Sequence, residues 1–363
     1  MSTVAIATVP HAASLKRRVR ATLAWLHLWV GLTVGTLFAL VALAGTVLVF
    51  HVDLLKLQHP QLVQHAPVAD GRVLSAIVAE WSPKGLRSLD LPSADLPVWQ
   101  GYFKDGQRGY FAPEDGTLLL TRTHHDDALM WLHEWHVELL GGDVGKEVLG
   151  VVGWTVLALV LVGLYLWWPK RGRMLAQLKV FNGPPVRRWL TWHRSSGVVL
   201  LPLLVLAIFT GTGMIYSKGF GAAFMGVFGG EKPSAPKLKG DGPVDWTQAL
   251  AHARVALPGA ELHRVSVPKA GDGAVAFRLQ ASGEWHPVGR STVHMDRTGT
   301  RQLEVYDATG NGLGARMSEA IYPLHIGAVG GGVMKWITAF VGLLPAFLLV
   351  TGFLFWRRRR HKG

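Results

Sequence analysis

Four histidines stand at repeated distances from glycines in the apolar parts of this 363-residue chain. Gly follows both His27 and His193 at the fourth position, and Gly-Thr follows both at the eighteenth and nineteenth. Gly-Gly follows both His136 and His325 at the fifth and sixth positions, Gly at the twenty-seventh and Trp at the thirty-first. Because imidazole is a common ligand of transition metals, these four side chains are the first candidates for chemistry.

The chain contains no cysteine. Disulfide bonds, cysteine-ligated iron–sulfur clusters, covalently attached c-type haem and a thiol nucleophile are therefore excluded. Histidine remains the main candidate ligand for a transition metal.

The composition, 49% apolar and 17% charged residues, is typical of a membrane protein with several spans. Four segments contain no Lys, Arg, Asp or Glu, and each is about as long as the roughly 20 residues that cross a bilayer. These segments are 21–52, 148–169, 195–217 and 336–356.

The net charge of +13 comes from three short segments that contain Lys and Arg but no Asp or Glu: 1–20, 169–194 and 357–363. The positive-inside rule then places both termini and the middle loop in the cytoplasm, and the two long connections on the other side. Because these basic residues flank spans, the pattern argues against a nucleic-acid-binding protein. The first apolar segment is much longer than the roughly 7–15 residues of a signal-peptide core, so it is predicted to be a retained span.

Each long connection is predicted to form a small helix followed by short strands with Gly turns. In the first connection the helix is expected at 73–81 and the strands at 98–103, 109–112 and 117–121. In the second, the helix is expected at 246–257 and the strands at 274–280, 292–295 and 301–305. The same order of elements in both connections, together with the repeated histidine spacing, predicts an internal duplication.

Under this duplication His27 and His193 lie together near the cytoplasmic side, and His136 and His325 lie together near the opposite side. Two histidines on facing helices can provide both axial nitrogens of a haem iron. Gly31 and its counterpart Gly197 would leave room for the flat macrocycle. The alternative is that each histidine is an interfacial polar anchor and the glycines are helix-packing positions.

Other histidines compete for a role. His133 lies one helical turn before His136 and is an alternative ligand, although its spacing to Gly163 breaks the repeat. His51, at the outer end of the first span, could approach an outer cofactor or be a solvated helix end. The stretch 124–127, His-His-Asp-Asp, is either a metal cluster or a polar approach to the helix that contains His136.

Four motifs give the chain a resemblance to the PepSY-associated transmembrane proteins, which include bacterial inner-membrane ferric-siderophore reductases. They are WLHLWVG at 25–31 with the later AGT, LHEWHVELLGG at 132–142 ending in LWWPKR, WLTWHRSSG at 189–197 with FTGTG, and YPLHIGAVGGG at 322–332 with TGFLFWRRRR.

The resemblance covers about residues 20–360. It implies that the two extramembrane units are PepSY domains and that two b-type haems bind between the spans. It further implies that His27, His193, His136 and His325 are the haem iron ligands, and that electrons from the cytoplasmic side reduce a periplasmic acceptor.

The predicted fold is an α-helical membrane protein, a four-span transmembrane bundle built from an internal duplication, with two small α+β PepSY-like periplasmic units. The predicted segments are a cytoplasmic tail (1–20), the first span (21–52), PepSY-like unit 1 (53–125), a pre-span helix and second span (126–168), a cytoplasmic loop (169–191), the third span (192–217), PepSY-like unit 2 (218–320), a pre-span segment and fourth span (321–356) and a basic cytoplasmic tail (357–363).

The predicted function is a haem-dependent oxidoreductase of the bacterial inner membrane that reduces a ferric siderophore or another ferric chelate, with an unidentified cytoplasmic electron donor. The alternatives are a PepSY-based binding or inhibitory module that the spans only anchor, electron transfer to a different periplasmic partner, and a transporter. The uncharged spans argue against the transporter.

Overall fold

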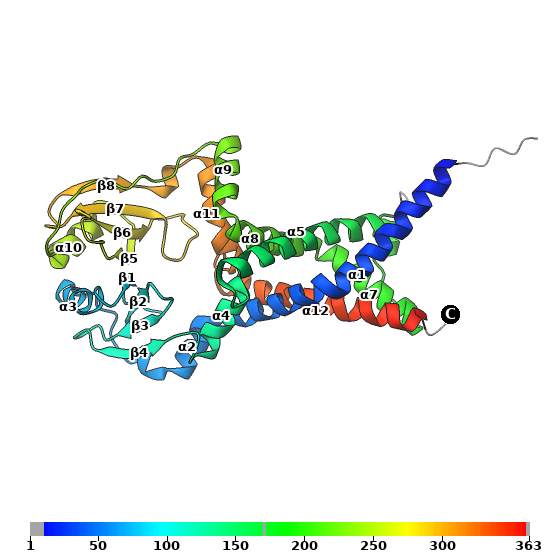
Figure 1. Cartoon of the computed structure of the whole chain (residues 1–363), viewed down its shortest axis with the longest axis horizontal. Coiled ribbons are helices and arrows are strands. Elements are labelled where there is room, and N and C mark those ends of the chain that lie inside the picture. The colour runs from blue at the N-terminus through cyan, green and yellow to red at the C-terminus, as the bar shows by residue number, and fades with distance from the viewer. Residues whose placement is uncertain (1–10, 170–171, 361–363) are drawn as a thin grey trace, which may run out of the picture.

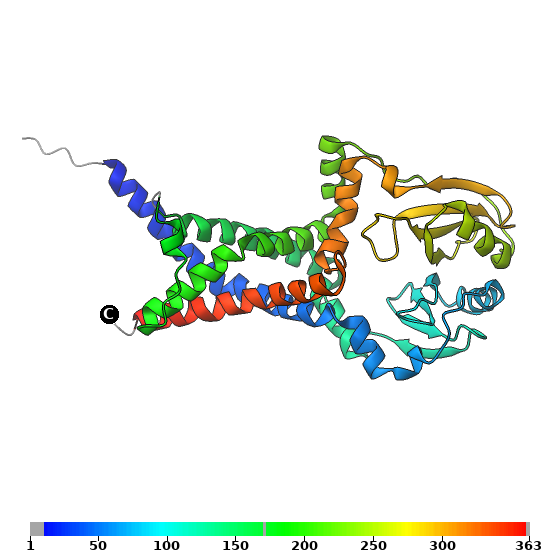
Figure 2. The ribbon, with the colours of Figure 1, turned by 180° about the vertical axis from the view of Figure 1, so that it is seen from behind.

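The long uncharged segments of the sequence form the helices of a bundle, and the two long connections form a β-sheet region beyond one end of it (Figure 1). The computed structural model describes residues 11–169 and 172–360. Figure 2 shows the same arrangement from behind, with the C-terminal end of α12 at the end of the bundle remote from the sheet.

Three helices are long and apolar enough to cross a membrane: α1 (His11–Leu48), α5 (Gly142–Trp167) and α12 (Gly331–Arg360). A fourth span exists only if α7 (Pro185–Val199) and α8 (Leu201–Ile215) are taken together, because they meet at a bend of 65°. Pro202 lies in the first turn of α8. Its missing N–H and its ring disfavour a continuous helix through the preceding turn, which explains the break.

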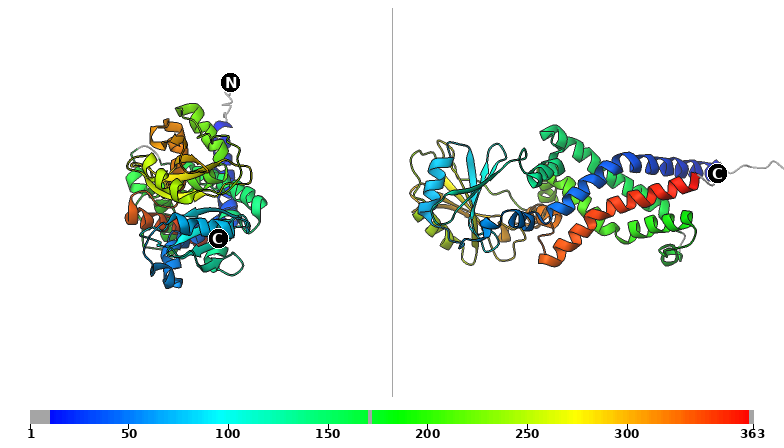
Figure 3. Two further views of the ribbon diagram at one scale, coloured as in Figure 1. Left: turned by 90° about the vertical axis from the view of Figure 1, so that its left-hand side faces the viewer. Right: turned by 90° about the horizontal axis from the view of Figure 1, so that it is seen from below.

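Within the bundle, α1 packs against α5 and α12, while α7 packs against α12 and α8 against α5. The view from below in Figure 3 shows these helices side by side. The most buried side chains of the bundle form one apolar cluster from α5, α8 and α12, made of Val152, Val156, Leu204, Ile208 and Leu344.

Two pairs of helices come unusually close where a threonine faces a glycine. A Cβ built at Gly342 of α12 would lie 2.2 Å from Oγ1 of Thr46, and one built at Gly153 of α5 would lie 2.2 Å from Oγ1 of Thr212. Gly153 follows His136 by 17 residues, as Gly342 follows His325, and the two threonines were already matched in the sequence. The same threonine–glycine contact therefore occurs twice, at positions that the sequence repeat matches with each other.

Short helices connect the bundle to the sheet. Of these, α4 (Ala128–Glu138) ends at Leu139 and Leu140, both in the left-handed region, before α5 begins. Similarly, α11 (Leu313–His325) ends before Gly327, Gly330 and Gly331, which have positive φ, and α12 follows. The remaining short helices are α2 (His51–Gln58), η1 (Pro60–Val63), α6 (Met174–Gln177), α9 (Ser217–Phe228) and η2 (Ala308–Gly310).

The two connections contribute four strands each to one antiparallel sheet of eight strands, in the order β4-β3-β2-β1-β5-β6-β7-β8. Antiparallel pairing of β1 with β5, with Leu89 opposite Val265, joins the two halves. The strands are β1 (Leu86–Asp90), β2 (Trp99–Phe103), β3 (Arg108–Phe111), β4 (Leu118–Arg122), β5 (Glu261–Ser266), β6 (Ala274–Gln280), β7 (Ser291–Asp296) and β8 (Gln302–Tyr306).

One face of the sheet packs against α3 (Gly71–Trp81) and α10 (Trp246–Ala256) to form the main apolar core. Each helix has an Asp N-cap whose carboxylate accepts a backbone N–H of the first turn, Asp70 from Arg72 and Asp245 from Gln248. Both helices and six strands were predicted from the sequence near these positions, whereas β1 and β5 were missed.

Replacing Gly342 by Ala is expected to lower the thermal unfolding temperature in detergent. The new methyl group would overlap Thr46 Oγ1 and lie 3.1 Å from the Ala42 carbonyl oxygen, and overpacking of this kind costs about 1–3 kcal/mol. Gly35→Ala in α1 is the matched control, because its nearest neighbour would be 3.8 Å away. Equal melting temperatures for the two variants would contradict the close packing of α1 on α12.

Candidate functional site

Two of the four histidines lie side by side within the bundle. His27 lies on α1 and His193 on α7, and their ring centroids are 6.2 Å apart with an angle of 82° between the ring planes. Both side chains are partly buried. The sequence register therefore brought together two residues from helices that are distant in the sequence.

The other two histidines meet at the end of the bundle that faces the sheet. His136 is in the last turn of α4 and His325 in the last turn of α11, so both precede the long helices α5 and α12. Their ring centroids are also 6.2 Å apart, with an angle of 34° between the planes. We call His27 and His193 the inner pair, and His136 and His325 the outer pair.

The Nδ1 atom of three rings lies within hydrogen-bonding distance of a backbone carbonyl oxygen on a neighbouring helix. His27 Nδ1 is 3.2 Å from Leu159 O, His136 Nδ1 is 2.9 Å from Val41 O, and His193 Nδ1 is 2.9 Å from Leu348 O. A carbonyl oxygen can only accept, so Nδ1 carries the proton and Nε2 keeps its lone pair.

In His325, too, Nδ1 carries the proton, but the acceptor is a hydroxyl group and not a backbone carbonyl. Its Nδ1 is 3.0 Å from Thr210 Oγ1, and that hydroxyl already donates to Leu206 O at 2.7 Å. Thr210 Oγ1 therefore accepts from Nδ1, and the same hydroxyl lies 3.2 Å from the Ala207 carbonyl oxygen. In all four histidines Nε2 is the nitrogen left free to bind a ligand, and among the described residues none of these Nε2 atoms makes a hydrogen bond.

Each ring packs on a glycine of the helix that accepts its hydrogen bond. The glycine stands four residues after the carbonyl residue in every case, so the carbonyl and the glycine share one helix face. A Cβ on these glycines would meet the ring at 2.8–3.2 Å, which leaves no room for a side chain. The contacts are Gly163 with His27, Gly45 with His136, Gly352 with His193 and Gly211 with His325.

The inner and outer pairs lie at different depths of the bundle. Gly45, which touches the outer pair, follows His27 of the inner pair by 18 residues on the uninterrupted helix α1. At 1.5 Å per residue, the two levels are about 27 Å apart along α1. This is close to the roughly 30 Å thickness of the hydrocarbon core of a bilayer.

The glycines that were expected to leave room beside the inner pair have other neighbours. A Cβ at Gly31 would be 3.8 Å from Leu159 Cδ2, and one at Gly197 would be 3.4 Å from Leu348 Cδ2. These are contacts with leucines of α5 and α12. The later members of the repeated motifs, Gly45 and Gly163 among them, are the ones that touch the rings.

The competing histidines lie outside the two pairs. His133 and His51 are both exposed, and His51 Nδ1 is 3.0 Å from Leu48 O of its own segment. Within the described residues no group of three or more His, Cys, Asp or Glu side chains is arranged to hold a metal ion. The candidate protein ligands of each site are therefore two imidazoles.

The polar stretch 124–127 begins α4 rather than forming a metal cluster. Asp127 is the N-cap of α4 and accepts from Met130 N at 2.9 Å. The same carboxylate receives two hydrogen bonds from the buried Arg122 at the end of β4, at 2.7 and 2.8 Å. His124 Nδ1 is 3.0 Å from a carboxylate oxygen of Glu134 on α4. These contacts fix the helix that carries His136 to the sheet.

Several buried polar atoms near the inner pair have no hydrogen-bond partner among the described residues. They include Nε of Arg188 and Arg194, Oγ of Ser195 on α7, and Nε1 of Trp167 at the end of α5. Arg187 instead stacks over Phe181, and Arg20 donates to Leu166 O at 2.5 Å. The unpartnered donors indicate that an acceptor, such as a carboxylate, fits beside the inner pair.

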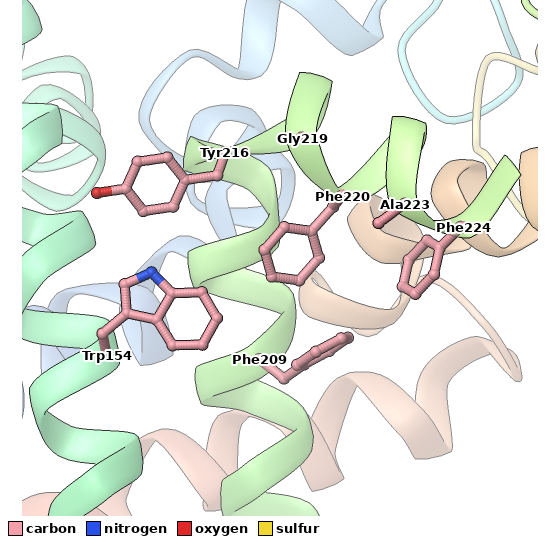
Figure 4. A pocket seen from close by; sticks show the side chains of 7 residues that line it. All are labelled: Trp154, Phe209, Tyr216, Gly219, Phe220, Ala223 and Phe224. Carbon is pink, nitrogen blue, oxygen red and sulfur yellow. The ribbon is translucent and has the colours of Figure 1, made fainter. Parts of the chain in front are cut away.

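An aromatic groove on the bundle lies apart from the histidines. Figure 4 shows it between α5, α8 and α9, with Trp154 and Phe209 facing Phe220 and Phe224. Its volume is about 490 Å³. Such an apolar surface suits contact with lipid chains at the end of a membrane bundle.

Comparison with protein-family models finds that residues 24–359 match the model of the PepSY-associated TM region. The chain belongs to this family. It is therefore a membrane protein that carries a PepSY module, as its sequence motifs predicted, with membrane-type helices and a separate antiparallel sheet. A search of curated proteins found no significant match.

Arg122→Gln is expected to destabilise the attachment of α4 by about 3 kcal/mol, because it leaves a buried carboxylate without its ion-pair partner. Arg72→Gln is the matched control, since Arg72 pairs with the N-cap Asp70 of α3 but is exposed. The measurement is the melting temperature of both purified variants in detergent. A similar loss in both would show that burial of the Arg122 pair is unimportant.

The same pair predicts a pH dependence. Burial alone would raise the pKa of Asp127, but hydrogen bonds from Arg122 and the Met130 N–H hold that pKa below its usual value. The stability that Asp127 confers is therefore fully present above the usual carboxyl pKa, near pH 4, and is lost as the pH falls below that value through the lower pKa of the folded state. In Arg122→Gln this component of the acid-induced fall in melting temperature should shrink.

Proposed function

We propose that this protein is a b-type haem protein of the bacterial inner membrane that passes electrons across the membrane and reduces a periplasmic ferric chelate, such as a ferric siderophore. The observation that carries the proposal is the arrangement of four histidines as two pairs, each with Nδ1 hydrogen-bonded and Nε2 free. Bound haem would supply one-electron chemistry at a potential that its axial ligands and surroundings adjust.

The two imidazoles of each pair lie close enough together that both would hold one iron. The ring centroids are 6.2 Å apart in both pairs. An edge-to-face aromatic contact can have the same separation. Four Nδ1 hydrogen bonds that all leave Nε2 free are not expected from packing alone, and they favour ligation.

The residues of the chain would hold the cofactor in three ways. The backbone carbonyls and Thr210 keep each imidazole neutral in the Nδ1–H form. The glycines under the rings leave the room that each ring needs to lie against the backbone of the neighbouring helix. The unpartnered donors of Arg188 and Arg194 would receive carboxylate groups beside the inner pair.

The direction of electron transfer follows from the charged flanks. Lys and Arg concentrate in 1–20, 169–194 and 357–363, so we place these segments in the cytoplasm and the sheet in the periplasm. The inner pair then receives electrons from a reduced cytoplasmic donor. The outer pair lies next to the periplasmic sheet, where one electron converts Fe(III) to Fe(II), which oxygen-rich chelators bind more weakly.

The internal duplication is part of this proposal. The histidine–glycine contact, the Nδ1 hydrogen bond and the threonine–glycine contact each occur at matched positions in the two halves of the chain. Taking α7 and α8 as one bent span gives four spans. A duplicated half with two histidines then yields two pairs, each with one ligand from each half.

The visible absorption spectrum tests the proposal. Protein expressed in haem-replete cells should show a Soret band that shifts on reduction with dithionite. His193→Ala and His325→Ala should each lose about half of the bound haem, because each removes one ligand of a different pair. His133→Ala is the control and should keep both haems. Absence of a Soret band from correctly folded protein would leave the anchored PepSY binding module as the better function.

The glycines beneath the rings give a second spectroscopic test. Gly45→Ala adds a methyl group 2.8 Å from Cε1 of His136, so it should reduce or shift the absorption of one haem by displacing that ligand. Gly31→Ala on the same helix adds only an ordinary 3.8 Å contact with a leucine. Its spectrum should match the wild type. A normal spectrum for Gly45→Ala would contradict ligation by His136.

A further inference from the structure

The face of the sheet that does not pack on α3 and α10 carries many polar side chains, next to a smaller apolar cluster that includes Tyr110. Strand register places two neighbouring rows of side chains on it, because alternate residues of a strand share a face. One row runs across the first half as Arg122, Arg108, Tyr102 and Ser88. The next row crosses between the halves as Gln100, Asp90, Arg264 and Arg278.

Two of these arginines are neutralised by carboxylates. Arg122 pairs with Asp127, as described above. Arg264 makes a two-point contact with Asp90, with Nη2 at 2.9 Å from Oδ2. The Tyr102 hydroxyl also donates to Asp90, at 2.7 Å. The Tyr102 ring lies between two guanidinium groups, those of Arg108 and Arg264, each 4.4 Å from the ring centroid.

Three further arginines have no ion pair among the described residues: Arg108, Arg278 and Arg290. All three are partly buried, and Nε of Arg290 is fully buried without a partner. Burial, with the charges of Arg290 and Arg264, lowers the pKa of Arg278. Like charges held together in a partly desolvated place are costly unless an anion joins them.

The acidic groups nearby, Glu284 and Glu319, act on Arg278 and Arg290 through their charges but make no ion pair with them among the described residues. Glu284 accepts hydrogen bonds from the backbone N–H groups of Arg290 and Ser291 and from the Ser291 hydroxyl. Glu319 on α11 interacts with Arg290 at longer range, and burial raises the pKa of its carboxyl. We call Arg108, Arg264, Arg278 and Arg290 the arginine patch.

The connection after β6, which ends at Arg290, links the arginine patch to the helix that carries His325. The His286 ring, in this connection, stacks on Tyr322 of α11 with ring centroids 5.0 Å apart. Burial raises the pKa of Tyr322, and the charges of Arg264 and Arg290 oppose that shift. Figure 1 shows α4 and α11 at the junction of the sheet and the bundle.

Tyr322 and His133 each lie three residues, about one helical turn, before a histidine of the outer pair. Tyr322 is 36% exposed and His133 is also exposed, so solvent reaches the space between the sheet and the bundle. A ligand of the arginine patch would therefore sit about one turn of helix from the outer pair.

We propose that the arginine patch binds the ferric chelate and selects complexes with a net negative charge, such as polycarboxylate or catecholate complexes, over neutral or cationic hydroxamate complexes. This inference rests on the proposed function. The guanidinium fork matches the two oxygens of a carboxylate, and the faces of Tyr102 and Tyr322 offer flat apolar contact. The unpartnered guanidinium groups give the site its preference for anions.

Gallium(III) citrate tests the inference, because gallium(III) has the charge and size of iron(III) but is not reduced. The full-length protein in detergent should bind gallium citrate by isothermal titration calorimetry, and more tightly than a gallium hydroxamate chelate without negative charge. Rising salt should weaken the binding. Stronger binding of the hydroxamate chelate would overturn the selection by charge, and this comparison needs no variant.

The double variant Arg278→Gln/Arg290→Gln should weaken gallium citrate binding by about tenfold or more, because two charged hydrogen-bond donors are lost. Arg72→Gln/Arg301→Gln removes the same charge from exposed positions and should bind as the wild type does. Unchanged haem content and melting temperature show that each variant is folded. Equal affinity of the two folded double variants would overturn the assignment.

Free citrate and inorganic phosphate separate a chelate site from a general anion site. Both should bind more weakly than gallium citrate, and equal binding would overturn the assignment to a chelate.

Failure of the proposed function can be told apart from failure of the arginine patch. Protein without a Soret band that still binds gallium citrate through the arginine patch would contradict the proposed electron transfer but not the arginine patch. Protein with two haems and no gallium citrate binding would contradict the arginine patch alone.

Discussion

The bundle depends on the contact of each histidine ring with the bare backbone of a neighbouring helix. A ring can donate from Nδ1 to a carbonyl oxygen inside a helix only if no side chain covers that turn, and the glycine four residues later provides the opening. The contact fixes the distance between the helices and the rotation of each about its axis. Because it occurs four times, in α1 with α5, α4 with α1, α7 with α12 and α11 with α8, it also sets how the two halves of the bundle face each other.

Because the chain breaks before α5 and α12, the outer pair lies on short helices attached to the sheet, whereas the inner pair lies within the bundle. His136 and His325 lie at the ends of short helices rather than within the long ones. The Arg122–Asp127 pair holds the start of α4 to β4, and the His286–Tyr322 stack holds the connection after β6 against α11. A displacement of the sheet would therefore reach the outer pair directly. The inner pair, on α1 and α7, is separated from the sheet by most of the length of α1.

The sequence was sufficient to match the histidines, because the repeat spacing in the spans is free of insertions. It also predicted the strands that alternate regularly, such as 274–280, which is β6. It failed where structure depends on distant partners. β1 is only five residues long and pairs with β5, some 170 residues later, so no local pattern marks either strand. Gly31 was selected because it shares a helix face with His27, whereas the glycines that matter, such as Gly163, contact a ring from another helix. The spacing of residues within one helix does not reveal a contact that a glycine makes with a ring on another helix.

The surroundings of the four imidazoles determine which ring nitrogen carries the proton. His27 lies in an apolar segment without Asp or Glu, so a charged imidazole there would have no counter-ion on its own segment and the neutral form is favoured. Among the described residues, the groups next to the four Nδ1 atoms are backbone carbonyls and the hydroxyls of Thr210 and Thr351, and they accept the hydrogen bond from Nδ1. Nε2 of each ring then keeps its lone pair, and neither ring can donate to the other. A metal complex held by both imidazoles of a pair, as proposed above, would stabilise the packed bundle over any looser arrangement, since only the packed form brings the two rings together.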